Sequence, residues 1–190
     1  KEIPAIWNEE QVSVAENTGA GAYVIEGVAT DAGAEYDVIC NLEIKKVNYI
    51  KNFGFEEADM SMWNIDGAGI DKEMDNNKRT GDYSLKFWSA DPVSYTVEQE
   101  ITGIPAGTYE MGAYLQGGDA GSNAVFELYI KIDEEELTAP TKVTSWQQWD
   151  NPVISDIQIP DGAKVVVGVR ANAAAGAWGA WDDFYLYEAE

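Results

Sequence analysis

The sequence has 190 residues, of which 45% are hydrophobic and 12% aromatic, so it carries enough apolar surface to bury a core and is not a disordered chain. Its formal net charge of −22, from 34 acidic and 12 basic residues, repels phosphate backbones and anionic lipids, so nucleic acids and membranes are not expected partners. The absence of histidine removes the usual general base near pH 7 and the commonest transition-metal ligand. Triad hydrolases and zinc enzymes are therefore not expected.

Residues 1–47 are expected to form a small β unit. Residues 22–29 read as one strand, and a turn at Gly33 follows it. Residues 36–44 read as a second strand, because apolar and polar side chains alternate there. A sheet of so few strands is only marginally stable by itself. This unit is therefore expected to pack on a neighbour or to be truncated at its start. The single cysteine, Cys40, excludes a disulfide within the chain.

From residue 48 to residue 190 the pattern changes to a longer series of strands separated by Gly and Pro, without an amphipathic helix. This pattern predicts a second domain with a sandwich or jelly-roll fold. The segment 104–107 is expected to be a hairpin loop between the strands on either side of it. Alternation predicts that the following residues face the core: Tyr83, Leu85, Phe87, Tyr109, Met111, Ala113, Leu115, Phe126, Leu128, Ile130, Ile132, Val165, Val167, Val169, Phe184 and Leu186.

Two motifs carry a resemblance to a known family. The segment 52–57 reads Asn-Phe-Gly-Phe-Glu-Glu, and the segment 178–184 reads Trp-Gly-Ala-Trp-Asp-Asp-Phe. Both resemble the ends of galactose-binding-like carbohydrate-binding modules, and the segments 81–85, 107–109 and 114–118 follow the same order between them. The sequence from about residue 49 to 190 is most similar to carbohydrate-binding module family 61, an ancillary module of bacterial arabinogalactan endo-β-1,4-galactanases.

This resemblance implies an all-β protein with a galactose-binding-like β-sandwich (jelly roll) over residues 48–190. Residues 1–47 are similar to a bacterial Ig-like repeat that lacks its first strand, with Trp7, Tyr23, Gly27 and Cys40 in place. The implied function is non-catalytic binding of β-1,4-galactan by a monomeric module tethered to a galactanase. The parent protein is expected to be secreted or held at a bacterial cell surface.

Sugar recognition needs flat apolar ring faces together with amide, carboxylate or guanidinium groups that bridge hydroxyls. Trp88, Tyr114, Gln116, Arg170 and Asn172 fall at strand positions opposite the core and supply both kinds of group. They are predicted to form one concave sugar platform. The alternative is that a bulge shifts the strand parity, which would place Trp88 or Tyr114 in the core.

The remaining tryptophans divide into loop and core candidates. Trp178 follows a run of small residues that cannot bury an indole, so it is the first choice for a ring that stacks on the sugar. Trp146 or Trp149 could also line the site, although the family resemblance implies that Trp149 packs inside. Trp63 and Trp181 are expected to pack inside the fold.

The resemblance also implies a structural calcium ion held by Glu56, Asp82 and Asp182, which lie near the two ends of the second domain and in a turn between them. Carboxylates from distant segments suit Ca²⁺, which takes 6–8 oxygen ligands in loose geometry. The alternative is that these residues form a solvated acidic rim.

Two other functions are open at this point. A bacterial adhesion or scaffold domain that binds another glycan or a protein is compatible with an Ig-like unit joined to a sandwich. Glycosidase activity by paired carboxylates, for which Glu110 and Glu127 face outward, is not expected, because most glycosidase folds need a longer chain.

Overall fold

The computed structural model describes residues 2–18, 21–73 and 77–189. Contacts between Cα atoms divide the chain into two compact units, Lys1–Val47 and Asn48–Glu190. Each unit is described by itself. Among the described residues, no helix has the length and apolar character needed to span a membrane.

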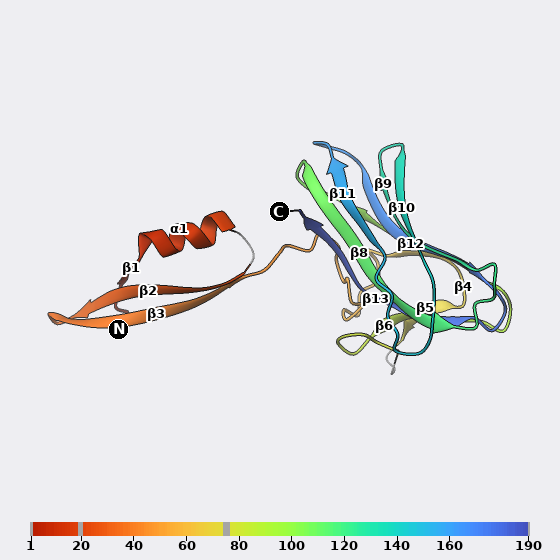
Figure 1. The fold of residues 1–190 in the computed structure, drawn as a ribbon, viewed down its shortest axis with the longest axis horizontal. Coiled ribbons are helices and arrows are strands. Elements are labelled where there is room, and N and C mark those ends of the chain that lie inside the picture. Colours follow the sequence, from red (N-terminus) through yellow and green to blue (C-terminus); the bar gives the residue numbers. More distant parts are fainter. Residues whose placement is uncertain (1, 19–20, 74–76, 190) are drawn as a thin grey trace. The chain divides into compact units, whose positions relative to one another are not determined.

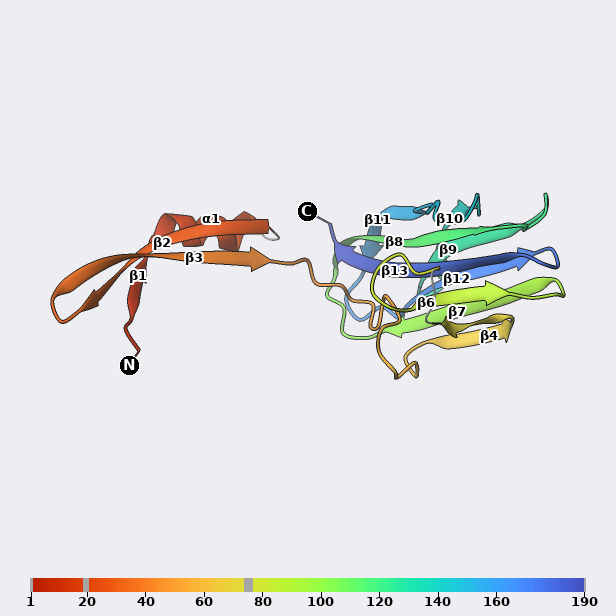
Figure 2. The same ribbon diagram turned by 90° about the horizontal axis from the view of Figure 1, so that it is seen from below.

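The first unit is a three-stranded antiparallel sheet with one helix packed against β2 (Figure 2). The sheet order is β1-β2-β3. Ala32 and Gly33 join β2 to β3, and both have positive φ, as a tight hairpin turn of type I′ requires. Its elements are β1 (Ala5–Trp7), α1 (Glu9–Thr18), β2 (Gly21–Asp31) and β3 (Ala34–Ile44).

The helix α1 differs from the expectation of a purely β unit. The side chain of Asn8 caps it by accepting a hydrogen bond from the Gln11 N–H at 3.1 Å, and two acidic residues occupy its first turn. The helix has few apolar residues, so periodicity alone does not reveal it. An immunoglobulin-like fold packs two sheets together. The described part of this unit has a single sheet, and its relationship to Ig-like repeats stays a prediction.

The second unit consists of two five-stranded antiparallel sheets that face one another (Figure 1). The first sheet has the order β10-β9-β12-β7-β4, and the second has the order β11-β8-β13-β6-β5. The strands of the first are β10 (Glu135–Thr141), β9 (Val125–Ile132), β12 (Val165–Ala173), β7 (Val93–Ile101) and β4 (Asn64–Ala68). Those of the second are β11 (Val153–Ile159), β8 (Gly107–Gly118), β13 (Trp178–Glu188), β6 (Ser84–Trp88) and β5 (Ile70–Glu73).

The core lies between these sheets and confirms the predicted alternation. The residues expected to face inward on β6, β8, β9, β12 and β13 are all buried. Tyr83, which precedes β6, is half-buried and packs against the edge of the core. Trp181 is also buried, as predicted, and its indole N–H donates to the hydroxyl of Tyr95 at 2.9 Å. Trp63 is buried against Phe55 and Phe184. The chain is therefore nearly all β, with a β-sandwich as its larger unit.

The segment 104–107 is not a hairpin loop. It joins β7 to β8, and these strands belong to different sheets, so the chain crosses from one layer of the sandwich to the other. Side-chain alternation reports which side of a strand is buried, but it carries no information about the sheet to which the strand belongs.

Candidate functional site

Two tryptophans lie side by side on the outer face of the β11-β8-β13-β6-β5 sheet. Trp178, the first residue of β13, is directly opposite Trp88, the last residue of β6, in the antiparallel register. Directly opposed residues share one face of a sheet, so the two indoles are neighbours. The exposed fraction of Trp88 is 58%, and Trp178 is half-buried. The alternative that Trp88 lies in the core is therefore wrong.

The position of the Trp178 indole is fixed by the strand β8. Gly118 is opposite Trp178 in the register, and a Cβ atom on Gly118 would lie 3.0 Å from the Cζ2 atom of the indole. The glycine therefore lets the ring lie close to the sheet. The indole N–H donates to the carboxylate of Asp119 at 2.8 Å. Packing and hydrogen bonding together hold this ring in one orientation.

These tryptophans line a hollow of about 490 Å³, which we call the tryptophan hollow. Asp71, Asn77 and an ion pair between Lys86 and Glu73, with an N–O distance of 2.5 Å, supply its polar groups. Flat apolar rings beside fixed donors and acceptors suit the C–H faces and the hydroxyls of a sugar.

Gln116 does not offer its amide to a ligand, contrary to the prediction. The side chain is fully buried, and its N–H donates to the carbonyl oxygen of Asn77 at 2.8 Å. Its amide oxygen accepts a hydrogen bond from the backbone N–H of Gln147. Gln116 therefore ties the segment around Asn77, which lines the tryptophan hollow, to the segment that carries Trp146.

Trp146 and Trp149 lie in that second segment, between β10 and β11. Trp146 has an exposed fraction of 52%, but it is not among the residues that line the tryptophan hollow. Trp149 is half-buried and does not belong to the buried core, in which it was expected. The segment is held at Gln147, whose φ of 58° is in the left-handed region.

Tyr114 faces outward on β8, as predicted, but does not join the tryptophans. It is opposite Asp182 in the register, and the guanidinium group of Arg79 lies 3.5 Å from its ring centroid. The ring lines a separate hollow at the other end of the same sheet face.

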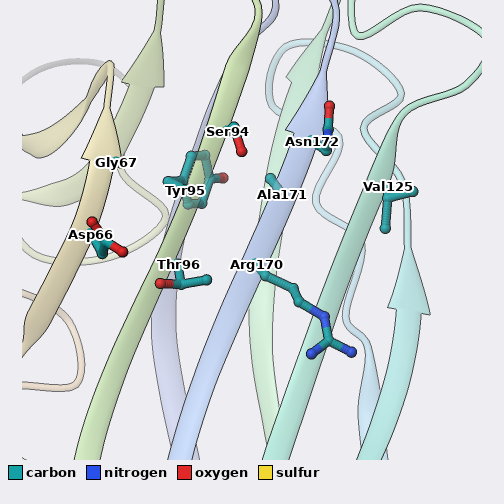
Figure 3. A pocket seen from close by; sticks show the side chains of 9 residues that line it. All are labelled: Asp66, Gly67, Ser94, Tyr95, Thr96, Val125, Arg170, Ala171 and Asn172. Carbon is teal, nitrogen blue, oxygen red and sulfur yellow. The ribbon is translucent and has the colours of Figure 1, made fainter.

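Arg170 and Asn172 were predicted to share the sugar platform, and the structure corrects this. Both lie on β12, on the outer face of the opposite sheet (Figure 3). The guanidinium group of Arg170 forms ion pairs with Glu127 at 2.7 Å and Glu136 at 2.9 Å. The pocket around these residues lacks an exposed aromatic ring, because the ring of Tyr95 belongs to the core. Strand alternation had grouped residues from two sheets.

The three carboxylates predicted to hold calcium do not converge on one point. The carboxylate of Glu56 accepts hydrogen bonds from the backbone N–H groups of Asp82 and Tyr83, each at 3.0 Å. The side chain of Asp82 pairs with Lys78 at 3.4 Å. Within the described ranges, no group of three or more Asp, Glu or Cys side chains is placed to share a metal ion.

Asp182 is buried at the junction of β13 with the segment 79–80. Its carboxylate accepts hydrogen bonds from the backbone N–H groups of Arg79 at 2.7 Å and Thr80 at 3.3 Å. Burial raises the pKa of this carboxyl to about 7, and the neighbouring charge of Asp183 acts in the same direction.

Comparison with solved structures identifies the family. The structure of TmCBM61 in complex with β-1,4-galactotriose is 30% identical to this chain, with a TM-score of 0.69. The match covers 99% of that structure and 75% of this chain. The chain belongs to carbohydrate-binding module family 61.

Other solved carbohydrate-binding modules share the fold of this family 61 chain. A structure of modules from the β-sandwich superfamily with promiscuous specificity is 15% identical, with a TM-score of 0.54, and covers 90% of this chain and 75% of its own. The C-terminal family 22 module of Clostridium thermocellum Xyn10B is 16% identical, with a TM-score of 0.51. The match covers 74% of this chain and 96% of that module. No family model matches the sequence, and the search of curated proteins finds no match. The larger unit is a carbohydrate-binding module.

Sequence reasoning missed Lys86 and Glu73, which line the tryptophan hollow, and Asp119, which binds the indole of Trp178. Lys86 lies between the inward-facing Leu85 and Phe87, so its outward direction could be read from the sequence. The role of Asp119 depends on the pairing of β8 with β13, which no local pattern encodes.

Proposed function

We propose that this module binds β-1,4-galactan at the tryptophan hollow and so holds an attached galactanase on its substrate. The observation that carries the proposal is the pair of indoles, Trp88 and Trp178, beside the polar groups of one hollow. Galactose has an axial 4-hydroxyl group, which leaves the C–H groups of one ring face free to stack on an indole. The relative that was solved with β-1,4-galactotriose supports this choice of sugar.

The charge of the chain is compatible with this ligand. A net charge of −22 repels anionic polymers, whereas galactan is neutral. A module tethered to an enzyme needs only weak affinity at a single site, because the tether raises the local concentration of the enzyme at the polymer. Such a role places the parent protein outside the bacterial cell, either secreted or at its surface.

Isothermal titration calorimetry against β-1,4-galactan tests the proposal. We expect saturable heat with galactan and much weaker heat with mannan and xylan as matched polymers. The proposal is abandoned if galactan gives no heat or if all three polysaccharides give the same heat.

Calcium is a second part of the proposal. Glu56 and Asp182 would hold the ion. Asp82 is not included among these ligands, because its carboxylate pairs with Lys78. Asp182 is a buried carboxylate beside Asp183, and Arg79 forms an ion pair with Asp183 at 2.7 Å. A divalent cation would lower the cost of ionising the buried group, and it would stabilise the fold without taking part in sugar chemistry.

A further inference from the structure

A second aromatic hollow lies on the same outer sheet face as the tryptophan hollow. Its volume is about 390 Å³. We call it the tyrosine hollow and define it by four partly exposed aromatic residues, Phe53, Tyr114, Tyr185 and Tyr187, and by the charged residues Arg79, Glu110 and Asp183. None of these residues contributes to the tryptophan hollow.

These four aromatic rings face outward, whereas Phe184, which also lines the hollow, belongs to the core. Phe53 has an exposed fraction of 45%, and the three tyrosines are half-buried. The rings of Tyr185 and Tyr187 are nearly parallel, with centroids 5.1 Å apart and planes inclined by 15°. Together they offer the apolar, flat surface that sugar binding needs.

Strand β8 makes room for an aromatic ring here in the same way as at the tryptophan hollow. Tyr185 is opposite Gly112 in the register, and a Cβ atom on Gly112 would lie 2.3 Å from the Cζ atom of the phenol ring. Trp178 is related to Gly118 in the same manner. One pair of strands therefore places an aromatic side chain of β13 over a glycine of β8 twice, once in each hollow.

Fixed polar groups surround the rings. The guanidinium group of Arg79 lies over Tyr114 and donates to Asp183 at 2.7 Å, and the hydroxyl of Thr80 also donates to Asp183, at 2.6 Å. Glu110 lies opposite Tyr187 in the register. Because the charge of Arg79 is offset by Asp183, the carboxylate of Glu110 leaves the hollow unfavourable for an anionic ligand. A neutral, hydroxyl-rich ligand fits this combination of groups.

The two hollows are too far apart to be one small site. Trp178 and Tyr185 lie opposite Gly118 and Gly112, which are six positions apart on β8. This separation corresponds to roughly 20 Å at about 3.3 Å per residue. The segment 77–80 contributes to both linings, with Asn77 in the tryptophan hollow and Arg79 and Thr80 in the tyrosine hollow. A polysaccharide is long enough to contact both hollows on one face.

We propose that the tyrosine hollow is a second carbohydrate-binding site, which binds a further stretch of the same neutral polysaccharide. This inference rests on the proposed function. Two linked sites bind a polymer more tightly than either site binds alone, because the second contact is intramolecular. An oligosaccharide that is too short to reach both hollows gains no affinity from the linkage.

Nuclear magnetic resonance of the full ¹⁵N-labelled chain, titrated with β-1,4-galactotriose, tests this inference. We expect two separate sets of amide shifts, one around Trp178 and Gly118 and the other around Tyr185 and Gly112. If only the first set shifts, the tyrosine hollow is not a sugar site, while the proposed function stands. If neither set shifts, both proposals fail. The wild-type spectra decide this without any variant.

Variants then measure the contribution of each hollow. Tyr187→Ala and Phe53→Ser are each expected to lower the affinity for polymeric galactan at least about 10-fold and to remove only the second set of shifts. Trp178→Ala should remove only the first set. Tyr36→Ala is the matched control, because Tyr36 is a 55% exposed tyrosine of the first unit. Unchanged galactan affinity in both folded tyrosine-hollow variants would overturn the linkage of the two sites.

Discussion

At the scale of single residues, removal of the Trp178 side chain is expected to weaken galactan binding while leaving the stability of the fold nearly unchanged. Its indole packs on a glycine and bonds to a surface carboxylate, so its removal leaves no cavity in the core. We expect Trp178→Ala to lower galactan affinity at least about 10-fold, a change of about 1.4 kcal/mol in binding free energy. Calorimetric titration and a thermal melt on the same sample measure both effects.

Trp7→Ala is the control for this variant, because Trp7 is a partly exposed tryptophan of the first unit. The control should bind galactan as the wild type does. A melting temperature of Trp178→Ala that falls by more than about 4 °C would show that the indole has a structural role, since that shift corresponds to roughly 1 kcal/mol or more in a domain of this size.

Asp182 predicts a pH dependence of stability. Its pKa is about 7 in the folded chain and near the ordinary value of 3.8 when the chain unfolds. Between these values the folded chain binds one more proton than the unfolded chain, so the free energy of unfolding falls as the pH rises from about 4 to 7. The carboxyls of Asp59 and Glu98 have lowered pKa values, so their contributions change only at the acid end of this range.

Thermal melts between pH 5 and 7.5, in the presence of a chelator, measure this effect. We expect the melting temperature to fall with rising pH and to level off above about pH 7. The variant Asp182→Asn should be less stable at pH 5 but should lack the slope. A wild-type slope of zero, or of the opposite sign, would contradict the assignment to Asp182.

At the scale of elements, Gln116 determines how the segments beside the tryptophan hollow are held on β8. Replacing it with Leu removes the hydrogen bonds to the carbonyl of Asn77 and the N–H of Gln147. Each lost hydrogen bond costs about 0.5–1.5 kcal/mol. We therefore expect Gln116→Leu to lower the free energy of unfolding by roughly 1–3 kcal/mol and to weaken galactan binding as well, although Gln116 is buried away from ligand.

Hydrogen exchange of the Gln147 amide reports the same event locally, and it should become faster in Gln116→Leu. Gln158→Leu is the matched control, because Gln158 is an outward-facing glutamine on the edge strand β11 whose bonds are exposed. The control should change stability by no more than about 0.5 kcal/mol. Binding that stays at the wild-type level in a folded Gln116→Leu would remove Gln116 as a positioning residue.

The sequence predicts the elements of the sandwich well and the site only in part, for a physical reason. Alternation on β8 predicts correctly that Tyr109 and Met111 are buried and that Tyr114 faces outward. It cannot show that β12 lies in the other sheet, so Arg170 was assigned to the wrong face. Long-range pairing decides that question. The helix α1 did carry a local signal, the cap formed by Asn8, which a search for periodicity overlooks.

At the scale of the whole molecule, the proposed calcium ion links the two ends of the sandwich chain. Glu56 follows the start of this unit, and Asp182 lies on its last strand. We expect a chelator to lower the melting temperature at pH 7.5 and added calcium to restore it. The effect should be smaller at pH 5, where Asp182 holds a proton and is a poor ligand. Melting curves that do not respond to chelator at either pH would discard calcium and leave the hydrogen bonds as the link between the ends.

The division of the chain predicts that residues 48–190 fold and bind without the first unit. The main buried core begins at Ile50 and draws all its residues from the second unit. Asn48, the first residue of that unit, is hydrogen-bonded to its last strand. Its side chain donates to the carbonyl of Phe184 at 2.9 Å and accepts from the N–H of Leu186 at 3.0 Å. We expect the fragment 48–190 to bind galactan within about 2-fold of the full chain.

A fragment that starts at residue 52 is the matched comparison. It lacks the hydrogen bonds of Asn48 and the buried side chain of Ile50, and loss of a buried Ile alone costs about 2–5 kcal/mol. Thermal melts should therefore show the fragment 52–190 well below the fragment 48–190, because the cut removes part of the core rather than a linker. Equal melting temperatures would mean that Asn48 and Ile50 contribute nothing to the stability of the sandwich. A fragment 48–190 that fails to fold would mean that the sandwich depends on the unit before it.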